Sequence, residues 1–135
     1  MRNSTPTYFE LQLSLLKRLV ALVEQTEPFT TTPMKESDEE FFHSLIRLAQ
    51  DMENHEGDYL YQGQQVISRI VSGYPHITPV IPRDLLWYFG GDCLHFMPDE
   101  EIQNFQQLDD LRFEAEAQEQ PFDWEQAKAS VFKLH

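Results

Sequence analysis

Apolar residues recur every three or four positions through most of this chain, and this spacing constrains the fold more than any other feature. The recurrence matches one face of an α-helix, which completes a turn about every 3.6 residues. It is clearest in residues 9–23, 41–52, 59–72 and 102–111. No segment alternates apolar and polar positions with β-branched enrichment, the pattern typical of a half-buried strand. The sequence therefore predicts an all-α protein.

Capping residues precede the first two periodic segments. Ser4 or Thr5 can accept a hydrogen bond from the first free N–H groups of a helix, and Pro6 suits the first helical turn. Ser37 and Glu40 have the S-x-x-E spacing of a capping box, in which each side chain bonds the other residue's backbone N–H. We therefore expect one helix to start near residue 6 and a second at Ser37.

Two further starts are indicated in the last third of the chain. Pro98 is followed by three acidic residues, which favour the positive end of the helix dipole. Asp123 with Gln126 has capping-box spacing and precedes the apolar positions of a last helix. These signals predict helices beginning at about residues 98 and 123.

Glycine and proline mark the expected helix ends. Gly73 is placed to end the third helix in the left-handed conformation, and residues 75–82, which contain three prolines, are expected to form an extended connector. Gly63 lies inside that helix, where glycine costs about 1 kcal/mol relative to alanine, so it is expected to mark a close helix crossing. The sequence thus predicts one bundle-like domain over residues 1–135, with about five or six helices.

The stretch 85–97, LLWYFGGDCLHFM, gathers aromatic residues around a glycine pair. We interpret it as a short helix that ends at Gly90 with a positive φ and then reverses direction. Trp87, Phe89 and Phe96 are expected to be buried in this corner.

Net charge is −13, from 23 acidic and 10 basic residues. The acids concentrate in residues 37–56 and 97–135. This excess disfavours direct binding to nucleic acid or to anionic membranes, which requires clustered Lys and Arg. The single cysteine leaves no intramolecular disulfide, the first residues lack a signal-peptide pattern, and no apolar run is long enough to span a bilayer. We therefore expect a cytoplasmic protein.

Cys93 and His95 are the only pair in the sequence that suggests covalent chemistry. If their segment is extended, residues two apart point the same way, and a histidine beside a thiol can activate it as a nucleophile. The alternative is a buried cysteine that packs as a small apolar group, beside a histidine bonded to the backbone. We favour the alternative and assign no catalytic residue.

Metal binding is the second chemistry considered. The residues that could converge on an ion are His76, Asp92, Cys93 and His95. The chain has no C-x-x-C, H-E-x-x-H or EF-hand spacing and no glycine-rich phosphate loop, so we expect no metal and no cofactor. Two more pairs with helical spacing, Glu39 with His43 and Asp51 with His55, are expected to be surface ion pairs.

Three functions remain open. The first is a protein-interaction or regulatory module without catalytic activity, whose acidic helices and aromatic corner meet an unknown protein partner with a basic surface, or a second copy in a homodimer. The second is a small thiol or metal-dependent enzyme centred on Cys93, His95 and His76. The third is an acidic mimic of nucleic acid that blocks a basic site on another protein. An apolar patch rimmed by acids would favour the first function, which we prefer.

Overall fold

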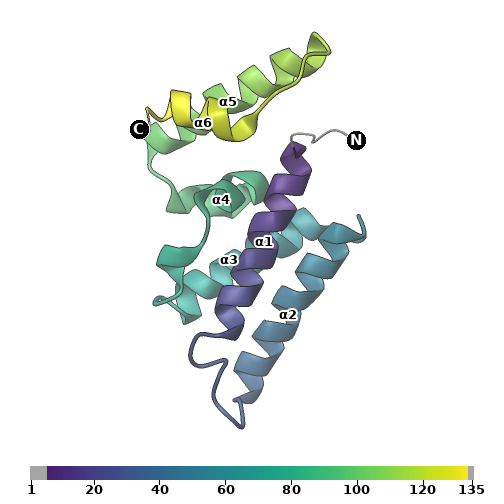
Figure 1. Ribbon diagram of the computed structural model, residues 1–135. Helices are drawn as coiled ribbons and strands as arrows, with labels where there is room; N and C mark the ends of the chain where they lie inside the picture. The colour runs from purple at the N-terminus through teal and green to yellow at the C-terminus, as the bar shows by residue number, and fades with distance from the viewer. Residues whose placement is uncertain (1–5, 134–135) are drawn as a thin grey trace.

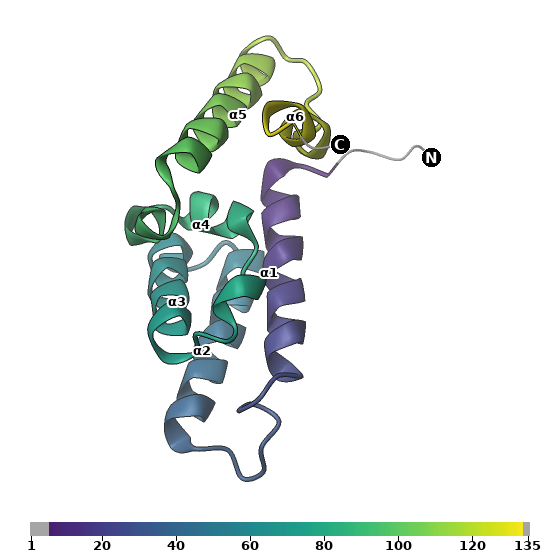
Figure 2. The ribbon, with the colours of Figure 1, turned by 90° about the vertical axis from the view of Figure 1, so that its left-hand side faces the viewer.

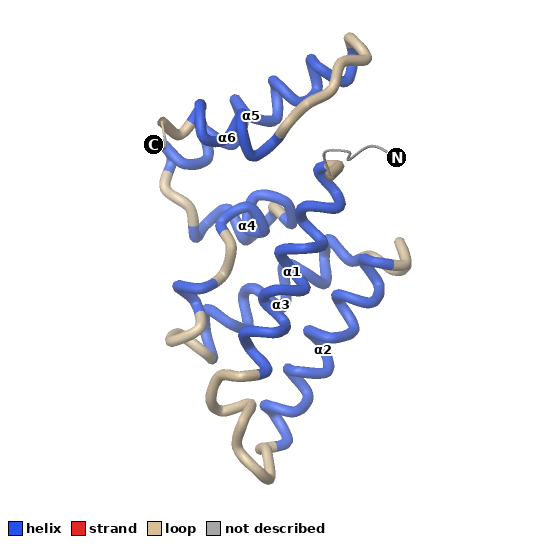
Figure 3. The backbone as a smooth tube through the Cα atoms, viewed as in Figure 1, coloured by secondary structure: helices blue, strands red, loops and turns tan. Residues whose placement is uncertain are grey.

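The computed structural model describes residues 6–133, and in that part the chain is helical and forms no strand (Figure 3). It has six α-helices and two short 3-10 helices, η1 and η2, which confirms the all-α prediction. In chain order they are α1 (Tyr8–Glu24), α2 (Glu36–Glu53), α3 (Tyr59–Gly73), η1 (Thr78–Val80), α4 (Arg83–Phe89), η2 (Gly91–Phe96), α5 (Asp99–Ala117) and α6 (Trp124–Val131).

The helices form a bundle-like arrangement (Figures 1 and 2). Helices α1, α2 and α3 pack side by side, and α4 with η2 lies across one end of that group, in contact with α1 and α3. Helices α5 and α6 pack on each other beyond α4, and the start of α1 reaches α6 (Figure 2). No helix in the described part of the chain is long and apolar enough to cross a membrane.

Helix α1 begins later than expected, at Tyr8. Thr7 is its N-cap: the Thr7 hydroxyl accepts from the Glu10 N–H at 3.1 Å, and the Glu10 carboxylate accepts from the Thr7 N–H at 2.8 Å. Ser4 and Thr5, the predicted caps, lie outside the described residues. Thr7 and Glu10 cap the helix because together they satisfy two backbone N–H groups, whereas a single hydroxyl satisfies one.

The buried face of α1 also departs from the apolar pattern. Leu16, Leu19 and Val23 are fully buried, but Gln12 is equally inaccessible and Leu22 is 49% exposed. Apolar residues cover more than one side of this helix, and only the packing of neighbouring helices selects the side that is buried.

The capping box predicted at Ser37 is wrong. Lys35 is the N-cap of α2, and no side chain bonds the cap. Asp38 is buried instead and accepts a hydrogen bond from the Tyr74 hydroxyl at 2.6 Å, while the Ser37 carbonyl accepts from Arg69 at 3.3 Å. Hydrogen bonds from Arg69 and Tyr74, at the end of α3, therefore form at this helix start in place of the predicted capping box.

The end of α3 and the segment after it differ from the prediction as well. Gly73 remains helical, and Tyr74 is the C-cap, with φ of −135°. Residues 75–82 form turns and the helix η1 instead of an extended connector. Ile77 and Ile81 are buried here, and the chain must turn tightly to direct both side chains into the core.

The aromatic corner follows the prediction at its glycines. Gly90 ends α4 with φ of 65° and ψ of −149°, and Gly91 follows with φ of 55°. Phe89 is buried as predicted, whereas Trp87 and Phe96 are only half-buried and pack against the edge of the core. Trp87 stays near the surface because its indole N–H donates to a half-buried carboxylate, described below.

Helices α5 and α6 start where the sequence indicated. Pro98 precedes the first residue of α5, Asp99. Asp123 is the N-cap of α6, and its carboxylate accepts from the Gln126 N–H at 3.1 Å.

Candidate binding cleft

A cleft of about 560 Å³ lies where the start of α1, the end of α4, the last turns of α5 and the segment before α6 meet. We call it the aromatic cleft. Its lining residues are Thr7, Tyr8, Phe9, Tyr88, Arg112, Glu116, Gln120, Phe122 and Trp124. Five of these residues are aromatic, so the cleft offers a partly apolar surface that is open to solvent.

Ring contacts hold the aromatic walls of the cleft together. The Tyr8 ring centroid is 4.4 Å from that of Trp124 and 5.6 Å from that of Tyr88. Phe122 meets Trp124 edge to face at 6.5 Å. Offset and edge-to-face pairs of this kind are attractive, so the walls are ordered before any ligand arrives.

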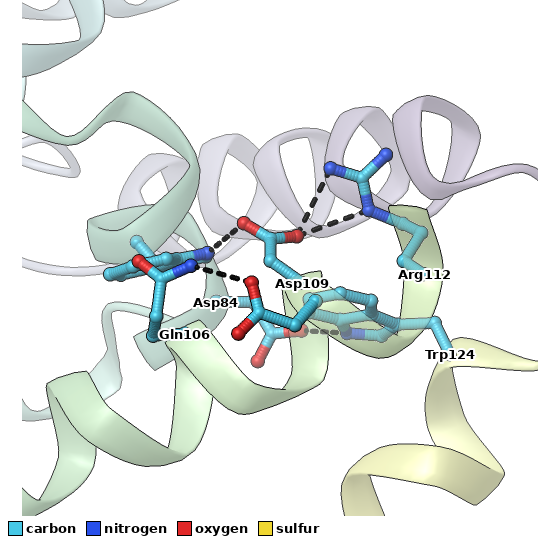
Figure 4. Close-up of polar contacts among 7 residues, drawn as sticks. Asp84, Gln106, Asp109, Arg112 and Trp124 are labelled. Carbon is cyan, nitrogen blue, oxygen red and sulfur yellow. Dashed lines mark hydrogen bonds and ion pairs between the residues drawn. The ribbon is translucent and has the colours of Figure 1, made fainter. Parts of the chain in front are cut away.

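Arg112 is fixed within the cleft by stacking and by charge. Its guanidinium carbon lies 4.2 Å from the Tyr8 ring centroid and 4.5 Å from the Phe113 ring centroid. The guanidinium pairs with the Asp109 carboxylate at 3.0 Å (Figure 4). This carboxylate also accepts from the Trp87 indole N–H at 2.7 Å. The positive charge of Arg112 is therefore compensated within the protein itself.

Asp84 anchors the opposite wall. Its side chain is almost fully buried, and it accepts from the Trp124 indole N–H at 2.8 Å (Figure 4). It also accepts from the Lys128 ammonium group. Both donors belong to α6, whereas Asp84 belongs to α4. These two contacts attach α6 to α4 and so fix the position of Trp124, which forms one wall of the cleft.

The tyrosine hydroxyls of the cleft are weaker acids than usual. Burial, reinforced by the negative charge of Asp109, raises the pKa of Tyr8 above its usual range. Burial also raises the pKa of Tyr88, with a further contribution from the neighbouring Tyr59 hydroxyl. Both groups are protonated at neutral pH, so they can donate and accept hydrogen bonds without carrying charge.

One exposed carboxylate lies in the lining of the cleft, and others are close to it along the chain. Glu116 is that lining residue, and neighbouring residues of the chain add further acids at the end of α5 and the start of α6. The set is Glu114, Glu116, Glu119, Asp123 and Glu125, which we call the acidic rim. Among residues 6–133, no cation lies within ion-pair distance of any member of this rim. The rim is a source of uncompensated negative charge beside an aromatic surface.

The family model of the PA2817-like proteins matches residues 4–134. The chain belongs to the PA2817-like family. This match spans every residue of the aromatic cleft and of the acidic rim. No curated protein and no solved structure matches the chain.

The two residues considered for thiol chemistry are not brought together in this PA2817-like protein. Cys93 is fully buried, and burial together with the charge of Asp92 raises the pKa of its thiol to about 11. The His95 side chain is 81% exposed and lies 4.0 Å from the Asp92 carboxylate. The segment is the 3-10 helix η2, in which residues two apart point in different directions, instead of the extended chain that the pairing required.

The residues considered as metal ligands are also dispersed. His76 is exposed, and its Nε2 lies 2.6 Å from the Glu27 carbonyl oxygen, in the loop between α1 and α2. Asp92 and His95 face solvent, whereas Cys93 faces the core. Within residues 6–133, no three His, Cys, Asp or Glu side chains are arranged to hold a metal ion.

The two expected surface ion pairs did not form within the described chain, where neither His43 nor His55 is within ion-pair distance of a carboxylate. His55 lies beyond the end of α2 with φ of 54°, so it no longer shares a helical face with Asp51. Its ring stacks on Phe9 at 4.6 Å instead.

Sequence reasoning did not single out Asp84, Asp109 or Arg112. The partners of Asp84 lie 40 and 44 residues further along the chain, and Trp87 lies 22 residues before Asp109. Only the spacing of Asp109 and Arg112, three residues apart on one helix, was a usable signal.

Proposed function

We propose that this PA2817-like protein is a protein-interaction module that binds a basic segment of a partner protein in the aromatic cleft. The proposal rests on the position of the acidic rim beside the cleft. The cleft has a volume of about 560 Å³ and mostly aromatic walls, and Glu116 is part of its lining. Clustered aromatic side chains with polar surroundings are typical of protein-binding surfaces.

Binding is favoured over catalysis because the polar groups near the cleft are already engaged. Asp84 and Asp109 each accept from an indole N–H and from a cation, so neither carboxylate is available as a general base. The Tyr8 and Tyr88 hydroxyls have raised pKa values and do not ionise at neutral pH. The side chains that remain accessible are mainly aromatic rings and rim carboxylates, with the neutral amide of Gln120.

The chemistry of the partner segment follows from charge complementarity. Arg112 is the only cation in the lining, and Asp109 compensates it, so the rim acids dominate the local potential. Opposite charges across an interface accelerate encounter and exclude wrong partners. We therefore assign to the partner an aromatic or aliphatic side chain that enters the cleft, flanked by Lys or Arg residues that meet the rim.

The test uses two short synthetic peptides with the same central phenylalanine, one flanked by lysines and one by glutamates. Titration of the protein is followed through the Trp124 indole N–H resonance, which reports the cleft wall directly. We expect the lysine peptide to shift this resonance and the glutamate peptide to leave it unchanged. Equal shifts with the two peptides would contradict the role of the rim.

Two charge-reversal variants test whether the lysine peptide binds at the cleft or is attracted only by the net charge. Glu116→Lys reverses a carboxylate in the cleft lining, whereas Glu39→Lys reverses an exposed carboxylate on α2 and changes the net charge by the same amount. We expect Glu116→Lys to weaken binding of the lysine peptide by about tenfold, or about 1.4 kcal/mol. Glu39→Lys should have a much smaller effect. Equal losses in both variants would mean that only net charge attracts the peptide, and the site assignment would fail.

A further inference from the structure

A second depression in the surface of the molecule lies between α2 and α3 and shares no residue with the aromatic cleft. Its volume is about 520 Å³. Phe41 and Val66, both buried, form an apolar floor. The polar residues that line it are Ser44, Arg47, Gln62, Gln65 and Arg69. We call this depression the arginine groove.

The charge of the arginine groove is opposite to that of the protein. The chain carries a net charge of −13 with 10 basic residues, and two of these ten line one groove. Within the described residues, neither Arg47 nor Arg69 lies within ion-pair distance of a carboxylate, although Lys17, Arg83 and Lys128 each do. Two like charges that line one groove without a counterion repel each other, and an anion placed between them would remove that repulsion.

Arg69 is held in position for such a role. Its Nη2 donates to the Ser37 carbonyl at 3.3 Å, and its guanidinium carbon lies 5.8 Å from the Phe41 ring centroid. These contacts, together with a side-chain hydrogen bond to Tyr74, restrain the Arg69 side chain over the apolar floor. A guanidinium fork suits planar carboxylates and phosphates because it can donate two parallel hydrogen bonds.

We propose that the arginine groove binds a small organic anion. Its carboxylate or phosphate group lies between Arg47 and Arg69, and its apolar part covers Phe41 and Val66. Gln62 and Gln65 can donate to or accept from other polar atoms of the ligand. The net charge of −13 repels a polyanion such as nucleic acid at longer range, so the ligand is a small molecule with one anionic group.

The test is a calorimetric titration with four probes: phenyl phosphate, benzoate, inorganic phosphate and phenol. Phenyl phosphate and benzoate separate the two anion chemistries, and phenol lacks the charge. We expect at least one aromatic anion to bind with a dissociation constant on the order of 1 mM or tighter, and phenol not to bind. Absence of binding by both aromatic anions would overturn the proposal. Equal affinities for inorganic phosphate and phenyl phosphate would overturn the role of the apolar floor.

Variants separate the groove from a general charge effect. Arg47→Ala removes a guanidinium that makes no ion pair within residues 6–133, and we expect it to weaken binding by about tenfold or more. Arg18→Ala removes an exposed arginine from α1 and is the matched control, expected to leave affinity unchanged. Equal losses in these two variants would contradict the site. Arg69→Lys keeps the charge without the fork and should weaken binding while the thermal unfolding midpoint stays close to that of the parent.

Discussion

Gly63 of α3 and Phe89 of α4 are in direct contact, and this contact requires a glycine. A Cβ atom on Gly63 would lie 2.2 Å from the Phe89 ring carbon Cδ1, far inside van der Waals distance. The ring is buried at the end of α4, just before the chain turns at Gly90. The close crossing of α3 and α4, on which the aromatic corner rests, therefore depends on the missing side chain.

Gly63→Ala is expected to destabilise the protein by about 1 kcal/mol or more. Alanine favours the helix by about 1 kcal/mol, but forcing a methyl group into a packed contact costs about 1–3 kcal/mol. Gly73→Ala is the control, since a Cβ atom there would meet nothing within 4 Å. Urea denaturation of the two variants measures the difference. If both variants are equally stable, the ring of Phe89 moves aside without cost.

Gly90→Ala is expected to cost about 1–3 kcal/mol for a conformational reason alone. The backbone has φ of 65° and ψ of −149°, a region open only to glycine, while the nearest atom to an added Cβ, the Trp87 carbonyl oxygen, lies 3.7 Å away. Thermal unfolding measures the loss. D-Alanine at the same position, introduced by semisynthesis, adds the same methyl group and adopts this conformation readily. It should restore most of the stability, and an equal loss with both enantiomers would point to crowding instead.

Gln12→Met is expected to stabilise the protein by about 1 kcal/mol. Gln12 is fully buried, and neither its Oε1 nor its Nε2 has a hydrogen-bond partner among the described residues. An unpaired buried amide costs about 1–3 kcal/mol, and methionine fills a similar volume without polar atoms. Chemical denaturation of the variant and its parent checks this. A destabilised variant would show that the amide is satisfied in solution.

Trp124→Phe is expected to destabilise the protein and to loosen α6 selectively. The substitution removes the indole N–H that donates to the buried Asp84 carboxylate at 2.8 Å. A hydrogen bond to a charged group contributes about 1.5–3 kcal/mol. Hydrogen exchange should accelerate in α6, with little change in α2 and α3. Uniform acceleration in all helices would mean that α6 does not open separately from the rest.

Cys93 is expected to react slowly with a thiol reagent in the native protein at neutral pH and rapidly once the protein is unfolded. Burial raises the pKa of the thiol from 9.0 to about 11, which lowers the thiolate fraction at every pH below that range. The labelling rate of folded protein should therefore keep rising with pH up to about 11, whereas that of the unfolded protein should level off near 9.0. His95→Ala should leave the rate unchanged, because the exposed His95 does not assist the thiol.

Rapid labelling of the folded protein at neutral pH, abolished by His95→Ala, would contradict this assignment. It would also restore the thiol-enzyme alternative centred on Cys93.

Much of the helical framework is determined by the sequence itself. Apolar spacing places the helices, Pro98 and Asp123 mark the starts of α5 and α6, and Gly63 and Gly90 mark the close crossing and the sharp turn. Each of these signals acts within about one or two helical turns, through capping bonds, backbone conformation or side-chain volume. Such local physics can be read from neighbouring residues alone.

The tertiary structure decided which groups are buried and which are paired. Gln12 is enclosed while Leu22 is exposed, and Asp38, in the first turn of α2, accepts a hydrogen bond from Tyr74, 36 residues away. The aromatic cleft exists because Asp84 receives donors from α6, 40 and 44 residues later. No local pattern specifies a partner at such separations. Burial and charge pairing depend on which helix faces are in contact once the whole chain has packed.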